Sequence, residues 1–356
     1  MSDRYGIDSH KLLFHVKRVS DWLDGRLIYP VYMELSPSGV CNHRCEFCGL
    51  DFMEYQSRYL DTAVLKERLT EMGALGVKAI MYGGEGEPFM HRDMADIILH
   101  TKASGIDVAM TTNGVLFTPQ RSEPALGALE WVKVSIAAGT AGTYAKLHNT
   151  KPADFNRVIE NMSHAARFKA ANGLNCTLGM QMLLLPDNQA EAATLARIAH
   201  DIGMDYLVIK PYSQHPQSKT RQYSEISYAD AERLASELAE FNTERFSVIF
   251  RTRAMRKWDD SARPYDRCLA LPFWSYIDAG GTVWGCSVYL RDERFLYGNI
   301  YQNTFKEIWE GERRRESLAW VERDMDARSC RVNCRMDEIN SYLWGLKRPP
   351  EHVNFI

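Results

Sequence analysis

From residue 31 to about residue 245, short apolar runs alternate with longer amphipathic stretches. This alternation is typical of repeated strand–helix units, in which helices join parallel strands and cover one face of the sheet. Six units can be counted, with strand-like runs at 31–36, 77–82, 106–111, 131–136, 175–185 and 206–210. The helix-like stretches lie at about 61–75, 91–104, 118–128, 153–171, 188–203 and 227–243. The pattern predicts an α/β fold with a partial (β/α)6 TIM-like barrel.

Two further segments flank this predicted barrel. Residues 1–30 are expected to form an N-terminal helix that packs outside it, and residues 31–245 the barrel itself. The alternation stops near residue 245, so residues 246–356 are expected to form a small C-terminal α+β domain. Its expected parts are a strand-like SVIFR, a basic linker from Arg251 to Lys257, a hairpin through Asp278 and Gly281, a helix near 303–318, and a cysteine-rich end.

Composition argues against some classes of partner. The formal net charge is −3, so no overall cationic field draws the chain to nucleic acid or to an anionic membrane. No window approaches the roughly 18 apolar residues of a membrane span, and the first residues show no export signal. We therefore expect a cytoplasmic protein with neither partner. In that compartment, clustered cysteines indicate metal rather than disulfides.

Three of the eight cysteines form a CxxxCxxC triplet, Cys41, Cys45 and Cys48, directly after the first predicted strand. Loops at the carboxyl ends of barrel strands are where functional residues gather. A [4Fe-4S] cluster normally takes four thiolates, so three cysteines leave one iron open to another ligand. A zinc loop is the competing interpretation, but zinc prefers four ligands in paired sets, which this triplet does not supply.

The triplet, with Phe47 before its last cysteine, resembles the motif of the radical S-adenosylmethionine superfamily. The resemblance implies that S-adenosylmethionine (SAM) chelates the open iron and is cleaved reductively to a 5′-deoxyadenosyl radical, which abstracts hydrogen from the substrate. It also implies that a GGE-type turn, here Gly83, Gly84 and Glu85, contacts the methionine ammonium. A flavodoxin or ferredoxin-type protein would supply the electron.

Polar residues at the ends of later strands are further candidates for SAM binding. By the same resemblance, Ser135 at the fourth strand is expected to contact the methionine carboxylate or the ribose, and Asn113 at the third strand is a second candidate. Many relatives carry an acidic residue two positions after this serine, where the chain has Ala137. Gln181 in the fifth strand could take that role, or it could be a buried amide bonded to the backbone.

Four more cysteines, Cys268, Cys286, Cys330 and Cys334, lie near the end of the chain, with Gly281 before the second. Their spacing resembles the auxiliary-cluster regions called SPASM and, in shortened form, Twitch, most closely the Twitch region of a radical dehydrogenase that oxidises an aminocyclitol alcohol. Four thiolates suit a second, fully ligated [4Fe-4S] cluster. A structural zinc site with four thiolate ligands is the alternative that the same residues allow.

A fully ligated cluster beside the substrate suggests an electron acceptor. We therefore expect oxidation of C–OH to C=O in a small polar molecule. The favoured substrates are a sugar, an aminocyclitol and a nucleotide-linked sugar. Radical modification of a peptide is the runner-up, although the 40 residues before Cys41 leave no room for a fused leader-binding domain. Epimerisation is disfavoured because the uncommitted Cys176 is expected at the bottom of the barrel, while elimination stays open. A structural metalloprotein is the non-enzymatic alternative.

The predicted basic linker supplies the candidate catalytic residues. Arg251 and Arg253 follow the last barrel-associated strand and precede Cys268, so they are expected between the two cluster sites, where they would stabilise a developing alkoxide. An acid such as Asp259 or Asp266 would take the hydroxyl proton. The same linker could instead bind the phosphate of a nucleotide-linked sugar, or be a solvated surface.

Overall fold

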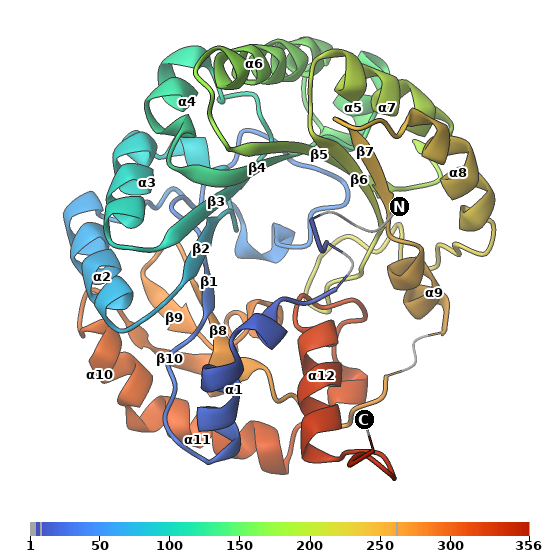
Figure 1. Cartoon of the computed structure of the whole chain (residues 1–356). Coiled ribbons are helices and arrows are strands. Elements are labelled where there is room, and N and C mark those ends of the chain that lie inside the picture. Colours follow the sequence, from blue (N-terminus) through green and yellow to red (C-terminus); the bar gives the residue numbers. More distant parts are fainter. Residues whose placement is uncertain (1–4, 8, 261–262, 356) are drawn as a thin grey trace.

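The computed structural model describes residues 5–7, 9–260 and 263–355, so parts of the predicted N-terminal segment (1–4 and 8) lie outside the described residues. The strands are β1 (Tyr32–Leu35), β2 (Ala79–Tyr82), β3 (Asp107–Thr112), β4 (Leu129–Ser135), β5 (Thr177–Leu184), β6 (Tyr206–Pro211), β7 (Ser247–Phe250), β8 (Trp274–Ile277), β9 (Thr282–Trp284) and β10 (Leu296–Asn299). They form one sheet in the order β10-β9-β8-β1-β2-β3-β4-β5-β6-β7. The sheet curves into an arc (Figure 1).

Helices cover the outer face of this arc (Figure 1). They are α2 (Thr62–Ala74), α3 (Met94–Ala103), α4 (Pro119–Leu126), α5 (Ala141–His148), α6 (Pro152–Ala171), α7 (Ala192–Asp201) and α8 (Ala231–Leu238). Local chemistry sets where they begin: the Asp61 carboxylate accepts the N–H of Val64 before α2, and α4 and α6 open on prolines. The α/β fold with a parallel sheet is therefore confirmed, with its main hydrophobic core between sheet and helices.

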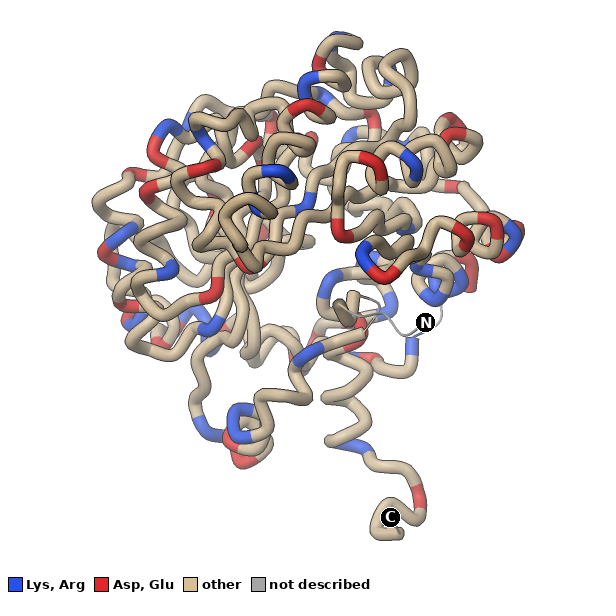
Figure 2. The backbone as a smooth tube through the Cα atoms, turned by 45° about the horizontal axis from the view of Figure 1, so that its top comes forward, with Lys and Arg blue, Asp and Glu red and all other residues tan. Residues whose placement is uncertain are grey.

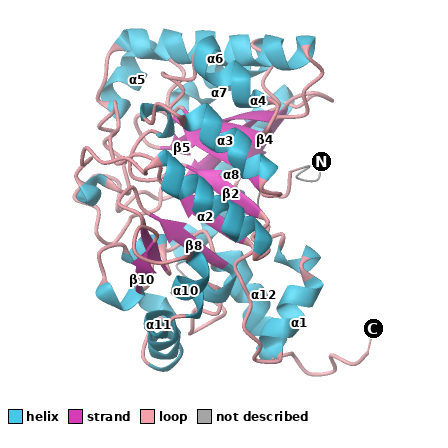
Figure 3. Cartoon of the chain, turned by 90° about the vertical axis from the view of Figure 1, so that its left-hand side faces the viewer, coloured by secondary structure: helices cyan, strands magenta, loops and turns pink. Residues whose placement is uncertain are grey.

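Alternate residues of each strand face opposite sides of the arc. On β4, Val132 and Val134 join the core beneath the helices, which leaves Lys133 and Ser135 on the inner face. We call this inner face, with the space that it encloses, the lumen. Figure 3 shows the strands behind the outer helices in a side view.

Residues from the start of the chain cover the inner face of β6 and β7. Tyr206, Val208 and Ile249 form a buried cluster there, and Tyr5 and Ile7 from the start of the chain pack against it. The rings of Tyr5 and Tyr206 have their centroids 5.2 Å apart. The start of the chain therefore occupies part of the inner face beside β6 and β7.

The sheet does not stop at the predicted boundary near residue 245. β7 pairs in parallel with β6, and α9 (Thr252–Asp260) follows it, so the predicted basic linker is wrong: this stretch is the helix of a seventh strand–helix unit. Ala254 and Met255 of α9 are buried while Arg253 and Arg256 are exposed. The run of basic residues concealed this amphipathic pattern, because it gave the segment the composition of a solvated linker.

The C-terminal segment extends the other edge of the same sheet. β8 lies parallel to β1, with Tyr32 opposite Trp274, and the predicted hairpin through Asp278 and Gly281 joins β8 to the antiparallel β9. The helix predicted near 303–318 is two helices, α10 (Phe305–Glu310) and α11 (Glu312–Arg323), broken at Gly311. The last helix, α12 (Asp337–Lys347), lies where the arc of strands is open (Figure 1).

The N-terminal helix α1 (Val16–Leu23) packs on this C-terminal segment rather than on the barrel helices. Val19 shares a hydrophobic cluster with Phe273 and Leu343, and the ring centroid of Trp22 lies 5.5 Å from that of Phe273. In the described part of the chain, no helix is both long and apolar enough to cross a membrane. Basic and acidic residues are interspersed along the chain (Figure 2), as expected from its near-balanced charge.

Candidate functional site

The cysteine triplet lies in the loop between β1 and α2, at the open end of the lumen. The N–H of Cys48 donates to the carbonyl of Cys45 at 3.1 Å, which folds the loop back on itself. Burial, followed by the charges of Cys48 and Cys41, raises the pKa of the Cys45 thiol well above its usual range. Three half-buried thiols whose ionisation is mutually unfavourable fit a metal cluster, because metal would stabilise their thiolates.

His148, the last residue of α5, hydrogen-bonds to one of these cysteines. Its Nδ1 lies 3.2 Å from the Sγ of Cys45, and its Nε2 accepts the N–H of Ala137 at 3.1 Å. An accepting Nε2 carries no proton, so the neutral ring holds its proton on Nδ1 and donates it to the sulfur. Burial lowers the pKa of His148 to about 3, which keeps the ring neutral.

Ligand atoms of His43, Cys45 and His148 lie within 4.8 Å of one another, as they would around a metal ion. Both ring nitrogens of His148 are already engaged in hydrogen bonds. His148 is therefore a donor to a cysteine ligand rather than a ligand itself.

The turn after β2 carries the predicted Gly83 and Gly84. Gly84 has a φ of 108°, and a Cβ there would lie 2.5 Å from both the Cβ of Ser36 and the hydroxyl of Tyr276. Only glycine fits a position with this backbone angle and this close approach of β1 and β8.

Glu85, the third residue of the predicted GGE turn, is buried and both of its oxygens are engaged. One accepts from the Arg58 guanidinium at 2.7 Å, and the other accepts from the N–H of Ala279 at 2.9 Å. Arg58 belongs to the cysteine loop and Ala279 to the turn after β8. Glu85 thus ties the cysteine loop to the C-terminal segment.

Glu87 lies closer to the cysteines, and sequence reasoning did not single it out. Its buried carboxylate accepts from the Thr112 hydroxyl at 2.5 Å and from the N–H of Asn113 at 2.7 Å. Burial, and then the charge of Glu87, raise the pKa of Cys41 to about 12. The available signal was the second Gly-Glu pair in GGEGEP, but spacing alone does not say which glutamate faces the cysteines.

The other predicted contacts to SAM lie along the same side of the lumen. Asn113 donates from Nδ2 to the Asn42 side chain at 2.7 Å, and this Nδ2 is 3.9 Å from the Sγ of Cys41. Ser135 and Gln181 are opposite each other on β4 and β5 and face the lumen. Neither side chain hydrogen-bonds to any described residue, so the structure does not bear out a backbone-bonded Gln181. Both are open to a ligand.

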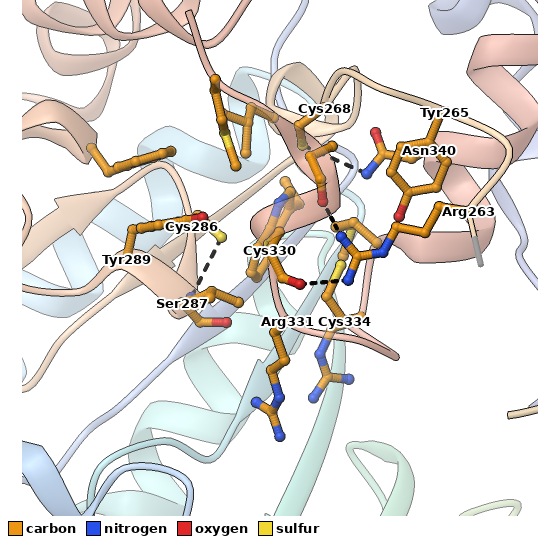
Figure 4. Close-up of a pocket in the computed structure, with 18 residues that line it drawn as sticks. Arg263, Tyr265, Cys268, Cys286, Ser287, Tyr289, Cys330, Arg331, Cys334 and Asn340 are labelled. Atoms are coloured by element: carbon orange, nitrogen blue, oxygen red, sulfur yellow. Dashed lines mark hydrogen bonds between the residues drawn. The ribbon is translucent and has the colours of Figure 1, made fainter. Parts of the chain in front are cut away.

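The four C-terminal cysteines surround a single pocket, as Figure 4 shows. Burial, followed by the charges of Cys330 and Cys268, raises the pKa of Cys286 well above its usual range. The Nδ2 of Asn340 lies 3.5 Å from the Sγ of Cys268, to which it donates. Together with Cys334, these cysteines bring four thiols to one pocket. Four converging thiols fit one fully ligated cluster.

The loop after β6 contacts both cysteine sets. The Ser218 hydroxyl donates to the carbonyl of Cys48 at 3.2 Å. His215 stacks on Phe52 of the first cysteine loop, with ring centroids 4.8 Å apart, and its Nε2 lies 3.3 Å from the carbonyl of Ser287 in the second. One loop therefore holds the two cysteine sets in place relative to each other.

Arg331 of the auxiliary cysteine loop comes close to the first cysteine loop. Its guanidinium donates to the hydroxyl and the carbonyl of Ser213 at 2.8 and 2.7 Å. One of its terminal nitrogens lies 3.8 Å from where a Cβ of Gly49 would stand, and Gly49 follows Cys48. Figure 4 shows the side chain pointing away from the labelled cysteines. The two cysteine sets thus belong to one site.

The two predicted catalytic arginines lie in different surroundings. Arg253 is exposed and pairs with Glu338 at 2.9 Å, while Lys257 of the same helix pairs with Asp337 at 2.5 Å. These pairs fasten α9 to the acidic first turn of α12. Arg251 instead continues the ladder of β7, where its N–H donates to the carbonyl of Ile209 at 2.9 Å.

The predicted proton acceptors, Asp259 and Asp266, are both exposed. Asp259 accepts the N–H of Tyr228 at 3.1 Å, which places it in the packing of α8 against α9. Neither carboxylate is positioned by the structure beside the lumen.

The fold and the two cysteine sets define an iron–sulfur enzyme built on a partial barrel, with an auxiliary cluster at its open side. Residues 35–198 match the radical SAM superfamily, and residues 268–335 match SPASM, an iron–sulfur cluster-binding domain. The chain is a radical SAM enzyme with a SPASM auxiliary-cluster domain. The second match spans all four C-terminal cysteines, which favours a cluster over zinc, so the cofactors are two [4Fe-4S] clusters and SAM.

Curated relatives share this architecture at low identity. The chain is 24% identical over 290 residues to an AdoMet-dependent heme synthase of Methanosarcina barkeri, an alignment that covers 76% of this chain and 79% of the relative. It is 28% identical over 222 residues to a GTP 3′,8-cyclase of Agrobacterium fabrum, which covers 59% of this chain and 60% of the cyclase. The chain thus spans less than two thirds of the cyclase.

Two solved structures show the same fold. The S-adenosylmethionine-bound SuiB of Streptococcus suis superposes with a TM-score of 0.65 at 18% identity, covering 88% of this chain and 72% of SuiB. The AdoMet-bound anSMEcpe superposes with a TM-score of 0.57 at 15% identity, covering 89% of this chain and 95% of anSMEcpe.

Proposed function

We propose that this enzyme oxidises an alcohol carbon of a small polar substrate, such as a sugar, an aminocyclitol or a nucleotide-linked sugar, held in the lumen between the two clusters. The observation that carries the proposal is the approach of Arg331 to Gly49, which brings the auxiliary cysteine loop against the SAM-cluster loop. A substrate at this opening would lie within reach of both clusters. A flavodoxin or ferredoxin-type protein would supply the electron for SAM cleavage.

When bound, the first cluster would cleave SAM reductively, and the auxiliary cluster would accept one electron. The carbinol carbon would give a hydrogen atom to the deoxyadenosyl radical, its hydroxyl would give up a proton, and one electron would pass to the auxiliary cluster. C–OH thereby becomes C=O. Arg251, at the end of β7, would orient the hydroxyl and stabilise its developing negative charge, because a guanidinium stays protonated. The proposal leaves Arg253 to its ion pair with Glu338.

On the other side of the lumen, the residues proposed to bind SAM are Gly83, Gly84, Asn113, Ser135 and Gln181. Ser135 and Gln181 offer polar groups with no partner among the residues described, and Asn113 contacts the cysteine loop. Glu87 joins this set because of its effect on Cys41, whereas the engaged oxygens of Glu85 favour a role in fastening the turn.

Epimerisation finds little support in the surroundings of Cys176. This thiol is 2% exposed and packs in the core beneath the helices, just before β5. A hydrogen donor for an epimerase would need to face the substrate in the lumen. Peptide modification is the second candidate, because a SuiB structure of the same fold was solved with its precursor peptide SuiA.

A substrate screen under anaerobic reduction tests the proposal. Nucleotide sugars, aminocyclitols and short peptides would each be scored for stimulated formation of 5′-deoxyadenosine and for the mass of the product. We expect stimulation by a sugar-like compound, and a product lighter by two hydrogens. A product of unchanged mass would instead indicate isomerisation, and stimulation by peptides alone would replace the proposal with the second candidate.

A further inference from the structure

Two lysines face the lumen without an anionic partner among the described residues. Lys133 lies on β4 and Lys210 on β6, each preceded by a residue that packs outward into the core, Val132 and Ile209. The Lys133 ammonium lies 5.4 Å from the ring centroid of Trp131, but neither lysine makes a hydrogen bond or an ion pair with any residue that the structure describes. A half-buried ammonium without a counter-ion among its described neighbours is unfavourable, so these two lysines require a physical explanation.

Three arginines share the electrostatic environment of these lysines. The positive charges that act on Lys210 come from Lys133, Arg251, Arg335 and Arg331, in that order. Four separate elements therefore contribute: β4, β6, the end of β7, and the auxiliary cysteine loop. We call Lys133, Lys210, Arg331 and Arg335 the lumen cation cluster, and Arg251 keeps its proposed place at the reacting hydroxyl.

Among the described residues, the acidic group that acts on Lys133 is Glu34 on β1, which itself pairs with Arg335. Burial, followed by the charges of Arg335 and Arg251, lowers the pKa of Lys133 to about 7 despite Glu34. Because Glu34 pairs with Arg335, no acidic side chain among the residues that the structure describes is left to pair with the two lysines. A bound anion would supply the missing negative charge.

We infer that the lumen cation cluster binds a phosphate group of the substrate, which makes the substrate a phosphorylated or nucleotide-linked small molecule. A phosphate ester carries up to two negative charges and three acceptor oxygens at neutral pH. Donors from three elements, β4, β6 and the auxiliary cysteine loop, can satisfy such a group, whereas one carboxylate offers only two oxygens.

This inference narrows the substrate class of the proposed function, and it rests on that function only because it takes the lumen as the substrate site. The inference is tested by anion binding and the proposed function by turnover, so either can fail without the other. Holoenzyme with both clusters would be saturated with SAM, so that the carboxylate of SAM already occupies its own site. Inorganic pyrophosphate would then be titrated calorimetrically into the parent, Lys133→Met, Lys210→Met and the surface control Lys102→Met, whose lysine pairs with Asp107 and Glu130.

We expect saturable binding to the parent and to Lys102→Met, and at least about tenfold weaker binding to each lumen variant, the loss of one charge-assisted hydrogen bond. Iron content and thermal unfolding would verify that the variants fold. The absence of saturable binding to the SAM-saturated parent would overturn the inference, and so would equally weakened binding to Lys102→Met. Succinate that binds as tightly as pyrophosphate, with the same dependence on Lys210, would overturn phosphate as the recognised group.

Discussion

The Nδ1 of His148 donates a hydrogen bond of 3.2 Å to the Sγ of Cys45, and so connects α5 to the loop of the catalytic cluster. The end of the same helix also holds the loop through its backbone. The N–H of Arg44 donates to the carbonyl of His148 at 3.2 Å, and the N–H of Glu46 to that of Leu147 at 2.9 Å. α5 therefore positions the triplet as well as contacting one of its sulfurs.

Replacing His148 should change the reduction potential of the catalytic cluster. A hydrogen bond to a thiolate stabilises the more negative, reduced state, so His148→Phe should lower the potential. One such bond contributes about 1 kcal/mol, which corresponds to about 40 mV for a one-electron couple. A redox titration followed by electron paramagnetic resonance measures this shift. His164→Phe, at a partly exposed histidine paired with Glu123, is the matched control, and an equal shift there would exclude the assigned role.

Each cysteine set should account for half of the bound iron. Cys41→Ala or Cys45→Ala should lower the iron content of reconstituted protein from about eight to about four atoms per chain, and should abolish formation of 5′-deoxyadenosine. Cys286→Ala should remove the other half. Cys176→Ala is the control, because this buried thiol lies outside both sets and should leave the iron count unchanged. Stoichiometric zinc in the triplet variants would contradict the second cluster.

Glu85→Ala should destabilise the fold. It removes a buried carboxylate that binds Arg58 and the N–H of Ala279, and leaves that N–H without its acceptor and Arg58 with only the more distant Asp278, at 4.0 Å. We expect the free energy of unfolding to fall by about 2 to 3 kcal/mol, near the lower end for a broken buried pair because Arg58 is partly exposed. Urea unfolding measures the loss. Glu123→Ala, which breaks a more exposed pair with His164, should cost less than about 1 kcal/mol.

Anion binding in the lumen should weaken as the pH rises. The pKa of Lys133 is lowered to about 7 by burial and then by Arg335 and Arg251, and a bound anion would raise it again. Binding is therefore strongest where Lys133 is already protonated, and affinity should fall several-fold between about pH 7 and pH 8. Sulfate is the suitable probe, because its own charge is constant in this range. Lys133→Met should flatten the profile, and an equally steep profile in that variant would remove Lys133 from the cluster.

The two arginines first predicted as catalytic should behave differently once a substrate is known. Arg251→Ala should lower kcat/KM at least about tenfold, the loss of one interaction with a developing charge. Arg253→Ala should stay within about twofold of the parent, because its guanidinium pairs with Glu338 on the surface. Parent-like turnover in Arg251→Ala would withdraw the role proposed for it.

Local patterns in the sequence predicted six strands and both cysteine sets, because apolar periodicity and ligand spacing are properties of neighbouring residues. The seventh unit was missed because the basic residues of α9 find their acidic partners, such as Glu338, only in the folded chain. α5 was missed because it is eight residues long and contains Gly142. The choice between Glu85 and Glu87 could not be made, since Arg58 and Ala279 are distant in sequence from the turn.

The parallel pairing of β1 with β8 constrains how this chain can be made in the cell. β1 emerges from the ribosome early, but one of its two hydrogen-bonding edges finds its partner only when Trp274 to Ile277 have been synthesised. Until then the growing chain carries an unpaired strand edge beside the cysteine loop, and such edges promote association with other chains. Completion of the barrel is thus a late event in translation, and insertion of the catalytic cluster into a fully formed loop would follow it.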